Sequence, residues 1–346
     1  MDVGAIGTRP TLAPCAREGT AGVVHGTPGT VRSMPAPAPH PPILAIVGAT
    51  ATGKSDLALD LAESLDGEIV NADALQLYRG MDIGTAKVGA AERERVPHHL
   101  LDVLDVTQEA SVSAYQREAR AAIAAIRARW HVPVVVGGSG LYVRALLDDI
   151  RFPPTDPDVR DRLERRAESE GVDSLRAELE RTDPEAAAAI GAQDVRRIVR
   201  ALEVGEITGG SFRAFLPRRE YLDPATLQIG LRREREELRE RVAVRVDRMV
   251  EQGLLDEVRA LRAQGLDEGA TARRAIGYEQ ALAVLDSAMT CREAIDATVA
   301  GTRRLVRKQD TWFRRDERVA WLPASCDDLL ARALDLVAAH RAEVRA

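Results

Sequence analysis

The segment ILAIVGATATGKS, residues 43–55, is the most informative stretch of this chain. Its first six residues form a short, continuously apolar run rich in β-branched side chains, which is typical of a buried parallel strand. Residues 48–55 match G-x-x-x-x-G-K-[ST], a pattern that arises by chance only about once in tens of thousands of windows, since glycine is roughly 7% of average sequence. The glycines allow backbone N–H groups to surround phosphate oxygens, Lys54 supplies a positive charge, and Ser55 is placed to bind Mg²⁺. We therefore predict a phosphate-binding P-loop.

The residues that follow the loop predict an α/β fold. A helix is expected from Ser55, with Leu57, Leu61 and Leu65 on one face and Gly67 just past its end. Another helix is expected at 112–129, and further strands at GEIVNAD (67–73), PVVV (133–136), LQIGL (227–231) and, at an edge of the sheet, RVAWLPA (318–324). Strands that alternate with helices predict a P-loop NTPase-like parallel sheet covered by helices.

A helical insertion is expected inside this core. No strand-like run appears between about residues 152 and 221. Two segments, Thr155-Asp156-Pro157 and Thr182-Asp183-Pro184, each open a helix with an acidic N-cap and a proline at the first helical position. We predict core segments at 42–148 and 223–346, separated by a helical insertion domain at 149–222.

Composition is that of an ordinary globular protein. The chain has 346 residues, of which 45% are hydrophobic and 29% charged, and a net charge of −6. No apolar run approaches the ~20 residues that would span a bilayer. Cys15, Cys291 and Cys326 show neither metal-ligand nor disulfide spacing, so we expect free thiols in the cytoplasm. Residues 1–41, rich in Gly, Pro, Ala and Thr, are expected to be a disordered leader.

A P-loop alone indicates only that a diphosphate or triphosphate binds, and most such loops belong to NTPases and kinases. Asp73 is expected at the carboxyl end of a strand next to the P-loop strand, where open α/β sheets bind their ligands. From the residues alone, an aspartate there has three interpretations: a metal-sphere acid, a general base or a helix N-cap.

Seven separated motifs give the chain a narrower resemblance. In their order and spacing they resemble bacterial tRNA dimethylallyltransferases, the IPP transferase family, and the similarity extends from about residue 42 to 322. The motifs are GATATGKS (48–55), NADALQLYRGMDIGTAK (71–87), VPHHLLD (96–102), VVVGGSGLYVRAL (134–146), RRIVRALEV (196–204), AIGYEQ (275–280) and RKQDTWFRR (307–315).

The resemblance implies transfer of a dimethylallyl group from dimethylallyl diphosphate to the exocyclic amine of the adenosine 3′ of the anticodon, in tRNAs that read codons starting with U. Diphosphate would be the leaving group, and a lysine, backbone N–H groups and Mg²⁺ would stabilise its developing charge. By the same resemblance, Asp73 takes the proton of the adenine amine. The implied diphosphate-binding loop comprises Gly48, Ala49, Thr50, Ala51, Thr52, Gly53, Lys54 and Ser55, with Thr50, Lys54 and Ser55 as its principal ligands.

Two more polar residues are assigned by resemblance. Ser139 stands where a threonine is more usual in the family, and it keeps the hydroxyl. Arg245 matches the family's diphosphate-binding arginine, although the residues alone explain it better as a solvated helix charge. One position departs from the pattern: Ala74 replaces the serine that usually follows Asp73, which removes a hydrogen bond to tRNA or to Asp73.

RNA contacts are expected because the target base must leave its stack to reach a buried diphosphate. Basic rims and aromatic faces suit an unstacked anticodon stem-loop, and the helical insertion would contribute to binding it. The candidates are Asp73, Ala74, Leu75, Gln76, Arg196, Arg197, Arg200, Arg274, Gly277, Tyr278, Arg303, Arg304, Arg307, Lys308, Gln309, Trp312, Phe313, Arg314 and Arg315. For any single arginine, a solvated face paired with glutamate is an equally good interpretation.

His98 and His99 have no third ligand at a suitable spacing, so we expect them to pack in a loop near the site, and His131 to cap or follow a helix end. Three other functions compete with the transferase: a small-molecule P-loop kinase, a prenyltransferase acting on free adenine nucleotides, and a noncatalytic P-loop RNA-binding module. The DIGTAK segment and the late basic-aromatic run argue against the kinase. We expect a cytoplasmic monomer that uses Mg²⁺ and has no membrane association.

Overall fold

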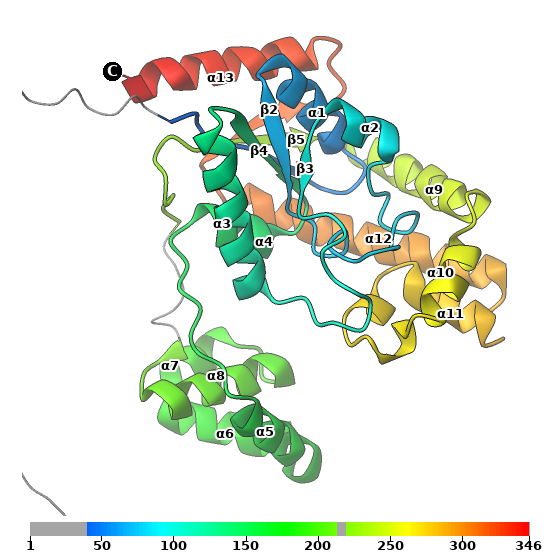
Figure 1. The fold of residues 1–346 in the computed structure, drawn as a ribbon. Coiled ribbons are helices and arrows are strands. Elements are labelled where there is room, and N and C mark those ends of the chain that lie inside the picture. The colour runs from blue at the N-terminus through cyan, green and yellow to red at the C-terminus, as the bar shows by residue number, and fades with distance from the viewer. Residues whose placement is uncertain (1–39, 213–218, 346) are drawn as a thin grey trace, which may run out of the picture. The chain divides into compact units, whose positions relative to one another are not determined.

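The computed structural model describes residues 40–212 and 219–345, so nearly all of the predicted leader, including Cys15, lies outside the described residues. Its centre is a six-stranded parallel sheet with the order β3-β2-β4-β1-β5-β6 (Figure 1). The strands are β1 (Leu44–Gly48), β2 (Gly67–Asn71), β3 (His98–His99), β4 (Val132–Gly137), β5 (Leu227–Arg232) and β6 (Val319–Pro323). The predicted strands and the parallel α/β architecture are thereby confirmed, with β6 at the edge as expected.

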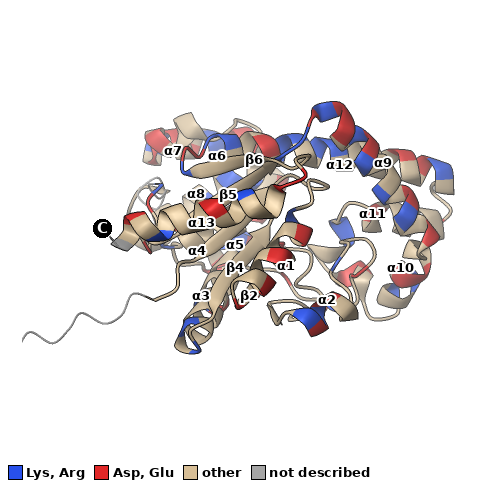
Figure 2. Cartoon of the chain, turned by 90° about the horizontal axis from the view of Figure 1, so that it is seen from above, with Lys and Arg blue, Asp and Glu red and all other residues tan. Residues whose placement is uncertain are grey.

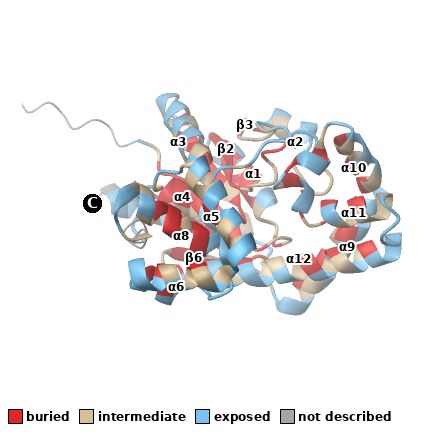
Figure 3. Ribbon diagram, turned by 90° about the horizontal axis from the view of Figure 1, so that it is seen from below, coloured by how far each residue is buried: buried red, intermediate tan, exposed pale blue. Residues whose placement is uncertain are grey.

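The P-loop strand β1 lies inside the sheet and is buried on both faces. Because side chains alternate along a strand, Leu44 and Ile46 pack against the helices α1 (Lys54–Ser64) and α13 (Leu329–Arg345). Ala45 and Val47 pack on the opposite face, in the cluster that contains α3 (Val112–Ala128) and α4 (Gly140–Leu147). Figure 3 shows the buried residues gathered in the sheet and on the helix faces turned toward it.

The strand order corrects one expectation about Asp73. We predicted that this residue follows a strand next to β1, but β4 lies between β1 and β2. Asp73 still comes directly after the carboxyl end of β2 at Asn71, so it faces the same edge of the sheet as the P-loop. The prediction was wrong because adjacency in sequence does not fix adjacency in a sheet whose later strands insert between earlier ones.

The end of α1 also differs from expectation. The helix ends at Ser64, and Asp66, with φ 52°, makes the left-handed turn that the sequence suggested for Gly67. Gly67 instead opens β2, where a Cβ would lie 2.7 Å from the carbonyl oxygen of Val132. The glycine is therefore needed for the close approach of two backbones.

The regular secondary structure in the described part of the insertion is helical. It contains α5 (Pro157–Glu170), α6 (Val172–Thr182), α7 (Pro184–Ala189) and α8 (Val195–Thr208), which share a hydrophobic cluster of their own. The two predicted N-caps are confirmed. The carboxylate of Asp156 accepts hydrogen bonds from the amides of Asp158 and Val159, and that of Asp183 accepts one from Ala186. The predicted boundaries at 149 and 222 stay predictions.

The remaining helices lie after β2 and after β5 in the chain. They are α2 (Ala90–Arg95), α9 (Arg235–Glu251), α10 (Leu254–Arg262), η2 (Leu266–Glu268), η3 (Ala272–Arg274), α11 (Tyr278–Leu285) and α12 (Cys291–Arg314). Cys291 is exposed, Cys326 is half-buried, and both are free thiols. In the described residues, no helix is long and apolar enough to cross a membrane.

Candidate active site around the P-loop

The P-loop has the backbone that its sequence predicts. Gly48 and Gly53 have φ values of 146° and 95°, which glycine adopts at little cost. A Cβ on Gly48 would lie 2.7 Å from the carbonyl oxygen of Leu231 on the neighbouring strand. Ala51 also has a positive φ, 68°, which is uncommon for a residue with a side chain and is typical of functional loops. The loop is therefore held in a fixed and partly strained conformation.

Three side chains from distant segments hold this loop. Arg233 donates from Nε to the carbonyl oxygen of Thr52 at 3.0 Å, and Arg241 donates to that of Ala51 at 2.9 Å. Gln309, which is buried in α12, accepts the amide hydrogen of Thr50 at 2.8 Å. Its other amide atom donates to the carbonyl oxygen of Gly138 at 3.1 Å. Since both ends of the Gln309 amide are used in these contacts, it connects the P-loop to the glycine-rich turn after β4, a role different from the predicted RNA contact.

Lys54, Asp73 and Arg245 meet at the carboxyl edge of the sheet. Burial lowers the pKa of Lys54 to about 8, while Asp73 acts to raise it and Arg245 to lower it further. Burial also lowers the pKa of Arg245, and the charge of Asp73 opposes this. Arg245 comes from α9 and donates from Nη2 to the carbonyl oxygen of Thr85 at 3.0 Å. The sequence favoured a solvated charge for Arg245, but the structure makes it a half-buried member of this group.

Asp73 is held in a hydrogen-bonded turn. Its amide donates to Oδ1 of Asn71 at 2.9 Å, and its own Oδ1 accepts from the amide of Leu75 at 3.0 Å. Ser139 accepts from the amide of Ala74 at 3.3 Å, so the hydroxyl after β4 fixes the backbone that follows Asp73. This hydrogen bond does not depend on the side chain at position 74, because its donor is the backbone amide of Ala74. No helix begins at Asp73, so the N-cap interpretation was wrong.

The predicted RNA-contacting residues fall into two classes. Some have their side chains in solvent, and others are used inside the protein. The exposed ones are Arg196, Arg197, Arg274, Arg304, Arg307, Lys308, Trp312, Arg314 and Arg315. Trp312 is 39% exposed and lies over Gly140, where a Cβ would be 2.2 Å from the indole. A tryptophan with one face on the protein and the rest in solvent suits base stacking.

The other predicted RNA contacts are internal. Tyr278 and Gly277 are buried, and Phe313 belongs to the core beside α3 and α4. Arg200 donates to the carbonyl oxygens of Pro153 and Pro154 and pairs with Glu203, so it fastens the linker to α8. The structure gives these side chains partners inside the protein, and their RNA contacts stay predictions, because a sequence motif does not separate a side chain that faces solvent from one that packs beneath it.

Two histidines in the VPHHLLD motif form hydrogen bonds inside the protein, as expected, but they lie in the short edge strand β3 and not in a loop. His99 lies 2.6 Å from buried Glu68, which also receives hydrogen bonds from Arg129. Burial alone would raise the pKa of Glu68, but these bonds hold it below its usual value. His98 contacts the carbonyl oxygen of Val96 at 2.7 Å. His131 follows the end of α3, as predicted.

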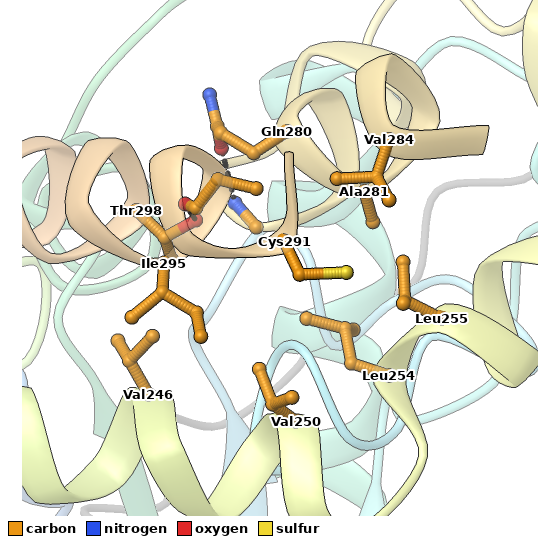
Figure 4. Close-up of a pocket in the computed structure, with 12 residues that line it drawn as sticks. Val246, Val250, Leu254, Leu255, Gln280, Ala281, Val284, Cys291, Ile295 and Thr298 are labelled. Atoms are coloured by element: carbon orange, nitrogen blue, oxygen red, sulfur yellow. Dashed lines mark hydrogen bonds between the residues drawn. The ribbon is translucent and has the colours of Figure 1, made fainter. Parts of the chain in front are cut away.

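A separate small cavity lies between α9, α10, α11 and α12 (Figure 4). Its volume is about 30 Å³ and its lining is almost entirely apolar, with the thiol of Cys291 among aliphatic side chains. Val246 and Val250 point into it from the same helix that carries Arg245. No charged side chain is among the described residues that line this cavity, so they offer nothing to a diphosphate, and the P-loop edge remains the candidate active site.

Sequence and structure comparisons identify relatives of this chain. The model of the IPP transferase family matches residues 76–316. The tRNA dimethylallyltransferase of Paenarthrobacter aurescens is 56% identical over 299 residues, which cover 86% of this chain and 96% of that protein. The enzyme of the same name from Streptomyces avermitilis is 57% identical over 291 residues, covering 84% and 93%.

Solved structures that are similar to this chain have names from the same family. The full-length tRNA isopentenylpyrophosphate transferase from Bacillus halodurans is 38% identical and superposes with a TM-score of 0.65 over 87% of this chain and 97% of that one. A eukaryotic dimethylallyltransferase acting on tRNA is 28% identical, with a TM-score of 0.74 over 85% and 77%. The fold, the P-loop edge and the similarity over most of the chain lead to one assignment: this chain belongs to the IPP transferase family and is a prenyltransferase.

Proposed function

We propose that this chain transfers the dimethylallyl group of dimethylallyl diphosphate to the exocyclic amine of the adenosine 3′ of the anticodon, in tRNAs that read codons starting with U. The observation that carries the proposal is the meeting of Lys54, Asp73 and Arg245 at one edge of the sheet, where the carboxylate acts to raise the pKa of both cations. Two cations suit a diphosphate, and a carboxylate suits an amine that must lose a proton. The high identity to named tRNA dimethylallyltransferases supports the same reaction.

The P-loop holds the leaving group. Free amides of the loop, the first turn of α1, the ammonium of Lys54 and the hydroxyl of Thr50 surround the diphosphate, with Arg245 closing the site from α9. The amide of Thr50 is already bonded to Gln309, so this residue contributes its side chain. These groups stabilise the negative charge that develops as the bond between C1 of the dimethylallyl group and the diphosphate oxygen breaks.

Asp73 serves the acceptor. The lone pair of the exocyclic nitrogen forms the new bond to C1, the electron pair of the broken C–O bond leaves with diphosphate, and one amine proton passes to the Asp73 carboxylate. Leu75 and Asn71 hold the carboxylate and its backbone, which leaves Oδ2 for the amine. Ser139 contributes by fixing the backbone at Ala74. A base placed in this way typically contributes about 10²–10⁴ in rate.

Mg²⁺ fits this site as a companion of the diphosphate. The described residues contain no group of three or more His, Cys, Asp or Glu side chains that would form a metal site of their own. Ser55, exposed in the first turn of α1, offers a hydroxyl, and Mg²⁺ commonly takes its remaining ligands from substrate phosphates and water. When bound, the ion would neutralise charge on the departing diphosphate.

The RNA surface includes the groove between α9 and α12. The groove has a volume of about 550 Å³ and is lined by Arg239, Arg303, Arg304 and Arg307 together with Glu236 and Glu240. Figure 2 shows Lys and Arg along these two helices, interspersed with Asp and Glu. Arg304 and Arg307 are exposed and Arg239 and Arg303 are half-buried, so the groove presents cationic groups that suit RNA phosphates. The proposal includes a monomer acting in the cytoplasm, with an anticodon stem-loop as the part of tRNA that is bound.

The test is a transfer assay with purified protein, Mg²⁺ and labelled dimethylallyl diphosphate. The acceptors are an unmodified tRNA with adenosine 3′ of its anticodon, the same tRNA with guanosine at that position, and free AMP. We expect label on the first tRNA only, and its loss in the Asp73→Ala variant. Transfer to AMP alone would replace the proposal with a nucleotide prenyltransferase, and phosphoryl transfer from ATP in place of prenyl transfer would replace it with a kinase.

A further inference from the structure

A single carboxylate accepts hydrogen bonds from the backbone amides of the loop at residues 82–85, called here the DIGT loop. Glu257, on α10, accepts from the amides of Asp82 and Ile83 through Oε2, at 3.1 and 2.7 Å. Its Oε1 accepts from the amide of Gly84 at 3.3 Å. Three successive N–H groups of an irregular loop therefore point at one side chain that is more than 170 residues away in the chain.

Tyr278 completes this arrangement from α11. Its hydroxyl donates to Oε1 of Glu257 at 2.5 Å, and the residue is fully buried. A Cβ on Gly84 would lie 2.4 Å from the ring of Tyr278, so the ring occupies the space that any other residue at 84 would need. Burial, and after it the charge of Glu257, raises the pKa of the Tyr278 hydroxyl, which therefore stays protonated and donates.

The opposite side of the DIGT loop faces the candidate active site. The carbonyl oxygen of Thr85 accepts from Nη2 of Arg245 at 3.0 Å and from Nε2 of Gln76 at 3.3 Å. Thr85 is itself buried, and its hydroxyl donates to the carbonyl oxygen of Met81 at 2.7 Å. One carbonyl thus orients both the diphosphate-binding arginine and the amide that lies three residues after Asp73.

We propose that Glu257 and Tyr278 are positioning residues for the prenyl transfer, acting through the DIGT loop on Arg245 and Gln76. This inference rests on the proposed function. The carboxylate fixes three amides, the fixed loop sets the direction of the Thr85 carbonyl, and that carbonyl holds the guanidinium toward the P-loop. A group held 1 Å from its productive place can cost about 10²-fold in rate, so a distant carboxylate of this kind has a measurable effect on the chemistry.

The first experiment replaces Glu257 by glutamine. Glu257→Gln keeps the size of the side chain but turns an NH₂ group toward loop amides that also donate. We expect kcat/KM for dimethylallyl diphosphate to fall about 10- to 100-fold. Tyr278→Phe keeps the ring against Gly84 and removes only the hydroxyl, so we expect a smaller fall in the same direction. The matched control is Asp256→Asn, because Asp256 is the preceding residue of α10 and pairs only with exposed Arg259 among the described residues.

A double-mutant cycle separates positioning from a general loss of stability. If Glu257 acts through Arg245 and Gln76, then adding Glu257→Gln to a chain that already carries Arg245→Lys and Gln76→Leu should cost no more than about threefold, since the interactions it supports are already gone. Thermal unfolding of each variant gives the folded fraction for which the rates are corrected. Full additivity of the two losses, or transfer at the wild-type rate by Glu257→Gln, would overturn the inference alone. An inactive wild-type chain would overturn the proposed function, and the inference with it.

Discussion

The charged groups around the P-loop and those inside the α5–α8 insertion are arranged in opposite ways. In the insertion, fully buried Glu203 accepts from Arg160 at 2.9 Å, from Arg200 at 2.7 Å and from the amide of Asp156 at 3.0 Å. At the P-loop, the charge of Asp73 acts to raise the pKa of both Lys54 and Arg245, yet neither cation forms an ion pair with any carboxylate in the described part of the chain.

The difference separates charges that hold the fold from charges kept for a ligand. Burial alone would raise the pKa of Glu203, but its two arginines and one amide keep the pKa below the usual value, so the anion is fully satisfied by the protein. Lys54 shows the opposite outcome: burial lowers its pKa to about 8, and the charge of Asp73 only partly offsets this. A group whose pKa is displaced by burial at the edge of a sheet is the expected signature of a binding site. A diphosphate would supply the missing partner.

The largest effect is expected at the carboxylate of the P-loop edge. Asp73→Asn keeps the side-chain oxygen that accepts from Leu75, so the turn should survive. The amide no longer takes a proton, and the rate of prenyl transfer should fall about 10²–10⁴-fold at saturating substrates. Single-turnover transfer of labelled dimethylallyl to tRNA measures this, with thermal unfolding measured on the same samples.

The control for this variant is Asp66→Asn. Asp66 is exposed at the turn after α1 and has a positive φ, which asparagine tolerates well. Its transfer rate should equal that of the wild-type chain. If Asp73→Asn lost stability in proportion to its loss of activity, Asp73 would belong with Glu203 among the structural charges, and the contrast between the two regions would disappear.

The second effect is expected in the insertion and concerns stability. Glu203→Gln leaves Arg160 and Arg200 without their shared anion, and breaking a buried pair from one side costs about 3 kcal/mol of unfolding free energy. Because the folded-state pKa of Glu203 is depressed, its contribution is present above the unfolded pKa and is lost as pH falls through the folded pKa. The difference between variant and wild type should therefore shrink below about pH 4. Urea unfolding at pH 7 and at pH 3.5 checks both statements, and an unchanged difference would contradict them.

Much of the fold followed from local signals. The apolar run before Gly48 and the G-x-x-x-x-G-K-S pattern gave the first strand, loop and helix, and Asp156 and Asp183 marked two helix starts. These features depend on residues close together in the chain, where steric and hydrogen-bonding preferences act directly. The order of strands depends on pairing at long range, which is why the position of β4 between β1 and β2 was missed.

The site was predicted less completely than the fold. The motifs identified Asp73, Lys54 and Ser139, but the residues that hold the loop from outside, Arg233 and Arg241, carried no motif. The sequence did contain one indication of their role. Arg233 lies just before the helix that follows the predicted strand at 227–231, and Arg241 lies within that helix, where a basic side chain lies close to the P-loop edge. Tyr278 and Gln309 show the reverse: the motifs that contain them suggested RNA contact, but both are buried, and burial is a tertiary property that a motif of mixed residues does not reveal.

The third effect is a pH dependence of substrate binding, which tests whether Lys54 is a charge kept for a ligand. If Lys54 binds diphosphate as an ammonium with a pKa of about 8 in the free protein, the KM for dimethylallyl diphosphate should be constant below that pH. Above it, the KM should rise about tenfold per pH unit, because each unit removes nine-tenths of the charged form. Lys54→Arg should lack this break, since a guanidinium does not titrate in the range. A break that persisted in Lys54→Arg would belong to another group.

Protonation of Lys54 should also affect the stability of the fold, and here a higher pH should be favourable. Because the folded-state pKa of Lys54 lies below its ordinary value of 10.5, the unfolded chain binds more protons between about pH 8 and 10.5. The free energy of unfolding contributed by Lys54 should therefore rise with pH across that window. Comparison of the wild-type chain with Lys54→Met by urea unfolding isolates this contribution. A fall in place of a rise would mean that Lys54 has a close anionic partner in the folded chain.

The smallest effect is expected for a charge that belongs to neither class. Arg307 is exposed in the groove between α9 and α12 and has no ion pair within the described residues, whereas Arg292 is exposed near the start of the same helix and pairs with Asp296. If Arg307 meets an RNA phosphate, Arg307→Gln should weaken tRNA binding about fivefold near 0.1 M salt and reduce the slope of log K against log salt by about 0.7–0.9. Arg292→Gln should change neither quantity. Filter binding over an about sixfold range of salt concentration measures both slopes. Equal slopes for the two variants would mean that Arg307 is solvated. The absence of an ion pair would then predict function only where the charge is also buried.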